Sequence, residues 1–412
     1  MANRNDTTLF GVPNKGPIKL TTGAPGIDFL HDVSRIISEA TQTLLTGEYG
    51  LGGDSSALQY GPRLGAPLFH ETLAKFLTEY YGDEVDNKCI VPTAGATHGL
   101  HLVASLFFRQ NDVIFVEDPT YFIALNILRD DFGMKIVPVA CDEGGMIISD
   151  LKQKIKEHVK KTTVTDTKPF RAMAYVIPTF HNPTSRIMPK ERCEAMVELA
   201  RQEKLLLFAD DVYNLLHYDP AIIKPPSRLY IYDNQQGNVI SNGTFSKLLS
   251  PGIRTGWIEA APKLVQLFHD SGVIWSAGAS NHYSSCLVAT AINMGLVQKH
   301  IANLKTQYTE SLNKMCDIIN KEAPFAQVER PRGGYFLWVK LPKEMDGKEV
   351  AKECMEKHNI VVLPGGMCSP IGDCKNYIRI SFSHYKPDVL SEATKIVCVA
   401  LNEVAKRCKA SY

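Results

Sequence analysis

The chain has 412 residues, of which 44% are hydrophobic and 22% are charged, an ordinary composition for a globular protein. This length exceeds what one small hydrophobic core requires, so we expect a large and a small domain. The 45 basic and 44 acidic side chains leave a formal net charge of +1, which indicates neither a nucleic-acid partner nor a membrane partner.

The cysteines and the N-terminal segment bear on the compartment. Ten cysteines are spread from Cys89 to Cys408 without a C-x-x-C pair, which favours a reducing compartment over a disulfide framework. The polar segment MANRNDTTLFGVPNKG lacks the apolar run of a signal peptide and has few arginines for a transit peptide. No apolar run approaches membrane-spanning length. We therefore expect a cytoplasmic protein.

From about residue 46 onward, helical patterns alternate with short apolar runs that end in Gly, Pro, Asn or Asp. This rhythm is typical of β-α units around a largely parallel sheet. The clearest runs are DVIFVEDPTY, RAMAYVIPTFHNPT and KLLLFADDVY. Open α/β sheets bind ligands at the carboxyl ends of their strands, so these three strands should direct polar side chains into one crevice.

The C-terminal third changes character. Helical spacing of apolar residues from Val288 to Asn320 predicts one long connecting helix. The following segments RGGYFLWVKLP, IVVLP and NYIRISFS read as strands, and GKEVAKECMEKHN and LSEATKIVCVALNEVAKRC read as helices. We therefore expect a large domain over residues 46–311 and a small α+β domain over residues 1–45 and 312–412. The sequence shows no repeats.

Small residues precede a helical pattern in IVPTAGATHGLHLVASLFF, where Thr93, Gly95 and Thr97 stand close together. A helix N-terminus reached through such residues exposes unpaired N–H groups that can bind an anion. A glycine turn with an ordinary threonine N-cap explains the same residues. This segment alone does not decide between the two interpretations.

Four polar residues follow the apolar strands, namely Tyr121 in EDPTYF, Asn182 in HNPT, and Asp210 and Tyr213 in ADDVY. Together they could present a flat ring, an amide, a carboxylate and a phenol to one small molecule. A core tyrosine or an Asn-Pro turn is an alternative for each taken singly. His181 is expected to form local hydrogen bonds rather than to act as a catalyst.

The segment SNGTFSKLLSPGIRTGW places Lys247 close to Arg254 among small hydroxyl residues. A lysine that forms an imine with a carbonyl compound needs a partly neutral amine, and both burial and a neighbouring arginine lower its pKa. A phosphate would neutralise Arg254, because a guanidinium binds it in a fork. Thr244 and Ser246 add hydroxyl donors to the same anion.

These motifs carry a family resemblance. GTFSKLLSPGIRTGW, HNPT, DDVY and YIRISF occur in the order of the class I and II pyridoxal-phosphate aminotransferases of fold type I, which the chain resembles from Leu20 to Arg379. The nearest branch is that of the kynurenine, 2-aminoadipate and aromatic aminotransferases. The resemblance implies an α/β fold with a mostly parallel, seven-stranded-type sheet between helices in the large domain and a smaller α+β domain.

The resemblance also implies roles for the residues around the cofactor, pyridoxal 5'-phosphate. Lys247 resembles the lysine that binds the cofactor's aldehyde and later acts as the base, and Asp210 resembles the carboxylate that keeps the ring nitrogen protonated. Tyr213 and Asn182 resemble the pair that hydrogen-bonds the phenolic oxygen, and Tyr121 resembles the aromatic residue stacked on the ring. The catalytic residues implied are Lys247, Asp210 and Tyr213.

Further residues match the phosphate and substrate contacts of the family. The implied phosphate-binding residues are Gly95, Ala96, Thr97, Thr244, Ser246 and Arg254. Tyr60, in ALQYGPRLG, is similar to the tyrosine that reaches the phosphate of the neighbouring subunit, which implies a homodimer with shared active sites. Arg379 resembles the clamp for the substrate's α-carboxylate, with Gly23 and Asn182 beside the substrate. A surface salt bridge is the alternative for Arg379.

Three positions depart from common family patterns. GATHG lacks the usual Ser-Gln or Ser-Glu pair, so Ala96 can bind phosphate only through its backbone. Ser185 stands where glycine is frequent. Cys368 stands where an aromatic residue often lines the substrate pocket, so no side-chain preference can be inherited.

The implied reaction transfers an amino group from an aromatic, kynurenine-like or 2-aminoadipate-like L-amino acid to a 2-oxo acid such as 2-oxoglutarate. A β-lyase, a racemase, a decarboxylase or an enzyme like aminocyclopropane-carboxylate synthase would use the same lysine and ring, so the motifs do not separate these cases. A non-enzymatic module of a transcription regulator would need a DNA-binding segment, and no basic helix-turn-helix pattern precedes ALQYGP. No metal site is expected.

Overall fold

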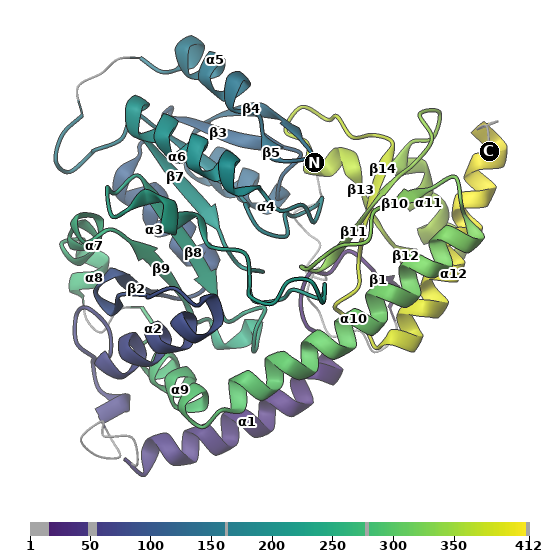
Figure 1. The fold of residues 1–412 in the computed structure, drawn as a ribbon. Coiled ribbons are helices and arrows are strands. Elements are labelled where there is room, and N and C mark those ends of the chain that lie inside the picture. Colours follow the sequence, from purple (N-terminus) through teal and green to yellow (C-terminus); the bar gives the residue numbers. More distant parts are fainter. Residues whose placement is uncertain (1–15, 48–55, 161–163, 277–279, 409–412) are drawn as a thin grey trace.

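The apolar runs of the sequence form the central strands of one large sheet (Figure 1). The computed structural model describes residues 16–47, 56–160, 164–276 and 280–408. The sheet has eight strands in the order β2-β9-β8-β7-β6-β3-β4-β5. Their bounds are Ile90–Thr93 (β2), Val113–Asp118 (β3), Lys135–Asp142 (β4), Gly145–Met146 (β5), Ala172–Val176 (β6), Leu205–Asp210 (β7), Val239–Thr244 (β8) and Gly256–Ala260 (β9).

Strand direction brings the polar strand ends to one edge of this sheet. β8, β7, β6, β3 and β4 pair in parallel, whereas β9 runs antiparallel to both β8 and β2. β2 therefore runs in the same direction as β8, and the two-residue β5 returns from β4 as a hairpin. The predicted, mostly parallel sheet is confirmed, and this edge hairpin is the eighth strand.

Helices cover both faces of the sheet, as the continuous burial of β6 and β7 requires. On one face, Met173 and Tyr175 join a core with α3 and α7; on the other, Ala172 and Ala174 join a core with α5 and α6. The helices of this part are α2 (Pro67–Tyr81), α3 (Ala96–Phe107), α4 (Phe122–Asn126), α5 (Ile148–His158), α6 (Lys190–Glu203), α7 (Pro262–His269), α8 (Gly272–Trp275) and α9 (His282–Asn293).

A smaller part combines the segment after residue 16 with the C-terminal quarter of the chain (Figure 1). β10 (Gln327–Val328), β11 (Phe336–Lys340), β14 (Tyr377–Ser381) and β13 (Leu363–Pro364) form an antiparallel sheet in this order, and β1 (Ile18–Lys19) pairs in parallel with β12 (Ile360–Val361). The helices of this part are α11 (Gly347–His358) and α12 (Pro387–Cys408). The exact domain boundaries at residues 46 and 311 stay a prediction.

Two long helices, α1 (Ile27–Leu45) and α10 (Leu296–Glu322), lie side by side and join the two parts (Figure 1). The prediction of one connecting helix from Val288 to Asn320 is wrong, because α9 ends at Asn293 and α10 begins at Leu296. Gly295 lies between them with a φ of 71°, a left-handed conformation that suits glycine and ends a helix.

Shorter turns of helix connect these elements. They are the 3₁₀ helices Ser56–Leu58, Asn87–Cys89, Leu229–Asp233, Pro251–Ile253 and Gly365–Cys368, and the π-helical turn Ile127–Asp131. All ten cysteines are free thiols. Within the described ranges, no helix combines the length and apolarity that a membrane span needs.

A buried ion pair fixes the edge of the large sheet. Arg228 is 3% exposed and donates to both carboxylate oxygens of Glu259 on β9, which is 1% exposed, and to Asp83 after α2 at 2.6 Å. The bidentate geometry satisfies charges that would otherwise be costly to bury.

We expect Glu259→Ala to lower the free energy of unfolding by about 3–5 kcal/mol, because the Arg228 charge would stay buried without its main partner. Denaturant unfolding measures this change. Glu403→Ala, which removes the exposed pair with Lys406, is the matched control and should change the unfolding midpoint little. Equal effects of the two substitutions would contradict this account of the pair.

Candidate active site

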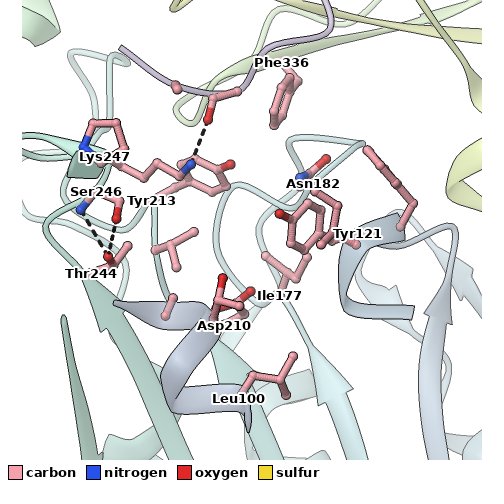
Figure 2. A pocket seen from close by; sticks show the side chains of 18 of the residues that line it. Leu100, Tyr121, Ile177, Asn182, Asp210, Tyr213, Thr244, Ser246, Lys247 and Phe336 are labelled. Carbon is pink, nitrogen blue, oxygen red and sulfur yellow. Dashed lines mark hydrogen bonds between the residues drawn. The ribbon is translucent and has the colours of Figure 1, made fainter. Parts of the chain in front are cut away.

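A cavity of about 360 Å³ opens at the carboxyl edge of the large sheet (Figure 2). The ends of β3, β6, β7 and β8 meet there with the start of α3, and the smaller part closes the cavity with β11, β14 and the segment before α1. The lining includes most residues that the sequence singled out, namely Gly23, Ala96, Thr97, Tyr121, Asn182, Asp210, Tyr213, Thr244, Ser246, Lys247, Arg254 and Arg379.

Asp210, the last residue of β7, is a buried carboxylate held by two donors. Tyr175 Oη donates to Oδ2 at 2.7 Å, and Asn242 Nδ2 donates to Oδ1 at 3.0 Å. Burial raises the pKa of Asp210, while these hydrogen bonds and the charge of Lys247 lower it. Sequence reasoning missed Tyr175 and Asn242. Tyr175 is the one polar residue of the apolar strand β6, whereas Asn242 stands among Ser241, Gly243 and Thr244 on β8 and gives no such signal.

Lys247 extends into the cavity after β8, and its Nζ donates to the Gly23 carbonyl at 2.7 Å (Figure 2). Burial lowers the pKa of Lys247 to about 8; the charge of Asp210 opposes this shift, and those of Arg379 and Arg254 add to it. The amine is therefore partly neutral near neutral pH. Burial contributes more than the neighbouring arginines.

Arg254 lies beside the first residues of α3. Its Nη1 donates to Ser246 Oγ at 3.3 Å, and its Nη2 donates to the Ala94 carbonyl at 3.1 Å. A Cβ at Gly95 would lie 2.8 Å from that Nη2, so the close approach requires glycine, as does the φ of 87°. The Thr244 hydroxyl donates to Ser246 Oγ at 3.0 Å. Cation, hydroxyls and helix N-terminus thus form an anion-binding corner.

Arg379 on β14 is 3% exposed and reaches across from the smaller part. Its Nη1 donates to Asn182 Oδ1 at 2.7 Å, and its Nη2 donates to the Thr21 carbonyl at 2.8 Å. The guanidinium lies 3.9 Å from the Phe336 ring centroid. It has no carboxylate partner among the described residues, and its buried Nε has no acceptor there. The alternative of a surface salt bridge is therefore wrong.

Tyr121 and Tyr213 both line the cavity but differ in their packing. Tyr121 lines the cavity at the start of α4, and Tyr213 packs its ring against Tyr335 and Phe336. Tyr60 is 83% exposed and does not line the cavity of its own chain.

The remaining expected residues support the loop after β6 or lie elsewhere. His181 bonds Thr184 Oγ1 at 2.9 Å and lies 3.2 Å from Glu117 Oε2, so it has the local partners expected of it. Ser185 adopts a φ of 60°, which explains why glycine suits this position, and its Oγ donates to the Phe336 carbonyl at 2.6 Å. Cys368 is fully buried and does not line the cavity.

Comparisons with known proteins match this geometry. The sequence profile of the aminotransferase class I and II family matches residues 15–397, so the chain belongs to this family. The aromatic-amino-acid aminotransferase 1 of Thermococcus litoralis is 28% identical over 90% of this chain and 85% of its own length. The 2-aminoadipate transaminase of Thermus thermophilus is 26% identical over 82% of this chain and 80% of its own.

Solved structures agree. The kynurenine aminotransferase of Pyrococcus horikoshii is 27% identical, superposes with a TM-score of 0.79 and is matched over 95% of this chain and 92% of its own. Family and structural neighbours together make the protein a pyridoxal-phosphate-dependent aminotransferase of fold type I.

The cavity fits pyridoxal 5'-phosphate. A partly neutral amine on Lys247 can bind its aldehyde, and the buried carboxylate of Asp210 can pair with a protonated ring nitrogen. The corner at Arg254 offers a cation and a helix N-terminus to the phosphate. Each ionic group of the cofactor thus finds an opposite charge in one cavity.

The pKa of Lys247 gives a direct prediction. Labelling of the cofactor-free protein with an amine-reactive reagent, mapped by mass spectrometry across a pH series, should show Lys247 half-reactive near pH 8. In Asp210→Asn the midpoint should fall further, because the carboxylate that stabilises the ammonium is gone. A midpoint at the ordinary lysine value, about 10.4, would contradict the burial of this amine.

Proposed function

We propose that the protein transfers an amino group from an aromatic, kynurenine-like or 2-aminoadipate-like L-amino acid to a 2-oxo acid such as 2-oxoglutarate. One observation carries the proposal: the cavity joins an amine, a buried carboxylate and a buried arginine that has no carboxylate partner in the part of the chain that the structure describes. The first two groups fit the cofactor, and the third is left for the carboxylate of an amino acid.

The residues act as follows in this proposal. When bound, pyridoxal phosphate supplies an aldehyde that condenses with amines and a protonated ring that accepts electron density from the substrate's Cα. Lys247 Nζ, once released, removes the proton from Cα and carries it as the general base and acid. Asp210 holds the ring nitrogen protonated. Asn182 and Tyr213 would donate to the phenolic oxygen, and Tyr121 would pack against the ring.

Arg379 orients the substrate. Its guanidinium is already fixed by Asn182, Thr21 and the Phe336 ring, so a carboxylate that binds it meets a preorganised donor. Lys247 donates to the Gly23 carbonyl, which belongs to the same short segment as the Thr21 carbonyl that Arg379 binds. A carboxylate bound to Arg379 would hold the substrate's Cα near Lys247, because the segment of Thr21 and Gly23 links the guanidinium to the amine.

The rest of the lining indicates the side-chain class of the donor. Arg254 and Arg379 are the arginines among the described lining residues, and the phosphate and the α-carboxylate use both. Apolar side chains line the cavity beside Arg379, including Phe122, Ile123 and Phe336. This lining supports an uncharged aromatic or kynurenine-like side chain in the cavity, whereas the second carboxylate of 2-aminoadipate or of 2-oxoglutarate would need a cation from outside these lining residues.

Lys247→Ala should lose the covalent adduct with pyridoxal phosphate and at least about a thousandfold in rate, because neither aldehyde capture nor proton transfer retains its amine. Borohydride reduction followed by peptide mapping measures the adduct, which wild type should carry on Lys247. A reducible adduct on another lysine would contradict the assignment.

The reaction class is tested with wild type and one amino acid at a time. Conversion of one equivalent of cofactor to its amine form, with one equivalent of 2-oxo acid released, is the expected result. Sustained turnover without a 2-oxo acid would instead indicate a lyase, racemase or decarboxylase. Phenylalanine, kynurenine and 2-aminoadipate as donors then rank the substrate classes.

We further propose a cytoplasmic homodimer in which Tyr60 reaches the phosphate of the partner's site. Tyr60 is 83% exposed and is not among the lining residues of its own cavity, which supports a role outside its own chain. The nearby Arg63 and Trp275 also pair on the surface, with the guanidinium 4.4 Å from the ring centroid and Trp275 62% exposed. Exposed aromatic and arginine side chains are enriched at interfaces.

Co-expression of Tyr60→Ala and Lys247→Ala chains tests this sharing. In a mixed dimer, one site keeps both Lys247 and the Tyr60 of the other chain, so about a quarter of all sites should be intact. Activity at limiting cofactor should then exceed that of either variant alone. Activity no higher than the average of the two variants would contradict Tyr60 acting across the interface.

A further inference from the structure

The turn that leads into α3 has nearly all of its carbonyl groups tied to side chains. Asn281 Nδ2 donates to the Thr93 carbonyl at 2.8 Å, and Thr93 Oγ1 donates to the Gly95 carbonyl at 3.2 Å. Asn242 Nδ2 donates to the Ala96 carbonyl at 3.1 Å, and Arg254 takes that of Ala94. The peptide planes of this turn are therefore held from several directions.

The N–H groups of the same turn are used very unevenly. Ala94 N–H donates to Nδ1 of His98 at 3.1 Å. For Gly95, Ala96 and Thr97, no acceptor of the N–H group is found among the described residues. His98 thus occupies the N–H group of Ala94, and the three N–H groups that follow stay available to an anion at the helix N-terminus.

The protonation of His98 is defined by its two partners. Nδ1 accepts from a backbone N–H, so the proton of the neutral ring is on Nε2, which lies 3.4 Å from Ser280 Oγ and can donate to it. Burial lowers the pKa of His98, and the charges of His101 and Arg254 lower it further. These surroundings favour the neutral ring that the contact with Ala94 requires.

We propose that His98 is a positioning residue for the cofactor phosphate: its neutral imidazole orients the Ala94 peptide so that the N–H groups of Gly95, Ala96 and Thr97 converge on the anion beside Arg254. The inference rests on the proposed function and adds to it a residue that contacts neither cofactor nor substrate. His98 stands at the third position of α3, and its side chain reaches back to Ala94, the residue before the N-cap Gly95.

A purely structural cap would stabilise the helix without favouring phosphate, so the test compares two ligands. Dissociation constants for pyridoxal 5'-phosphate and for pyridoxal, which lacks the phosphate, are measured by the absorbance of the bound form. His98→Ala should weaken pyridoxal phosphate binding about tenfold, the order of one lost hydrogen bond that orients a charged contact, and leave pyridoxal binding unchanged. His98→Gln, whose Oε1 can accept from Ala94, should restore most of the difference.

Controls separate the possible failures. His31→Ala, which removes an exposed histidine on α1 that does not act on His98, should change neither constant. His98→Leu fills the space without an acceptor and replaces His98→Ala if that variant does not fold. Equal weakening of both ligands, or no rescue by glutamine, would overturn the inference. If wild type forms no adduct on Lys247 with either ligand, the proposed function itself fails, which is a different result.

Discussion

The site depends on two opposite charges, a buried carboxylate and a partly buried amine, near the ends of neighbouring parallel strands. Asp210 ends β7, and Lys247 follows β8, so the sheet itself sets the distance between a carboxylate and an amine. Burial raises the pKa of the acid and lowers that of the base, while their mutual attraction opposes both shifts. The pKa of Lys247 is therefore low enough for a fraction of the amine to be neutral near neutral pH, and high enough for the amine to accept a proton.

The smaller part completes the cavity rather than merely covering it. Arg379 donates to Asn182, Ser185 donates to the Phe336 carbonyl, and the Gly23 carbonyl accepts from Lys247. Each of these contacts joins a group of the large sheet to a group from the other side. Movement of one part relative to the other would therefore change how the substrate carboxylate and the amine face each other.

Much of this arrangement could be predicted from the sequence, because strand ends in α/β sheets collect at one edge and each motif followed an apolar run. Asp210 and Arg379 stand out as charged residues in apolar strand patterns, and Lys247 stands out as a lysine among small hydroxyl residues. Tyr175 and Asn242 do not, because a single polar residue in a strand gives no sign of which carboxylate it reaches.

Two further features could not be predicted from the sequence, because they depend on backbone geometry. The break before α10 requires the left-handed conformation of Gly295, and an apolar periodicity continues across it without change. The contact of His98 with Ala94 depends on the direction of one peptide plane. Neither can be read from residue types, since glycine and histidine occur at many positions without these conformations.

The absence of a side chain at Gly23 also constrains the chemistry. A Cβ there would lie 2.5 Å from Cζ of Phe336, the ring that lies against the guanidinium of Arg379. A single methyl group would push the ring away and remove one of the three contacts that hold Arg379, leaving the hydrogen bonds to Asn182 and Thr21. The orientation of the guanidinium that we propose for binding an amino acid's carboxylate thus depends on the small size of residue 23, so this position admits little variation even though glycine performs no chemistry.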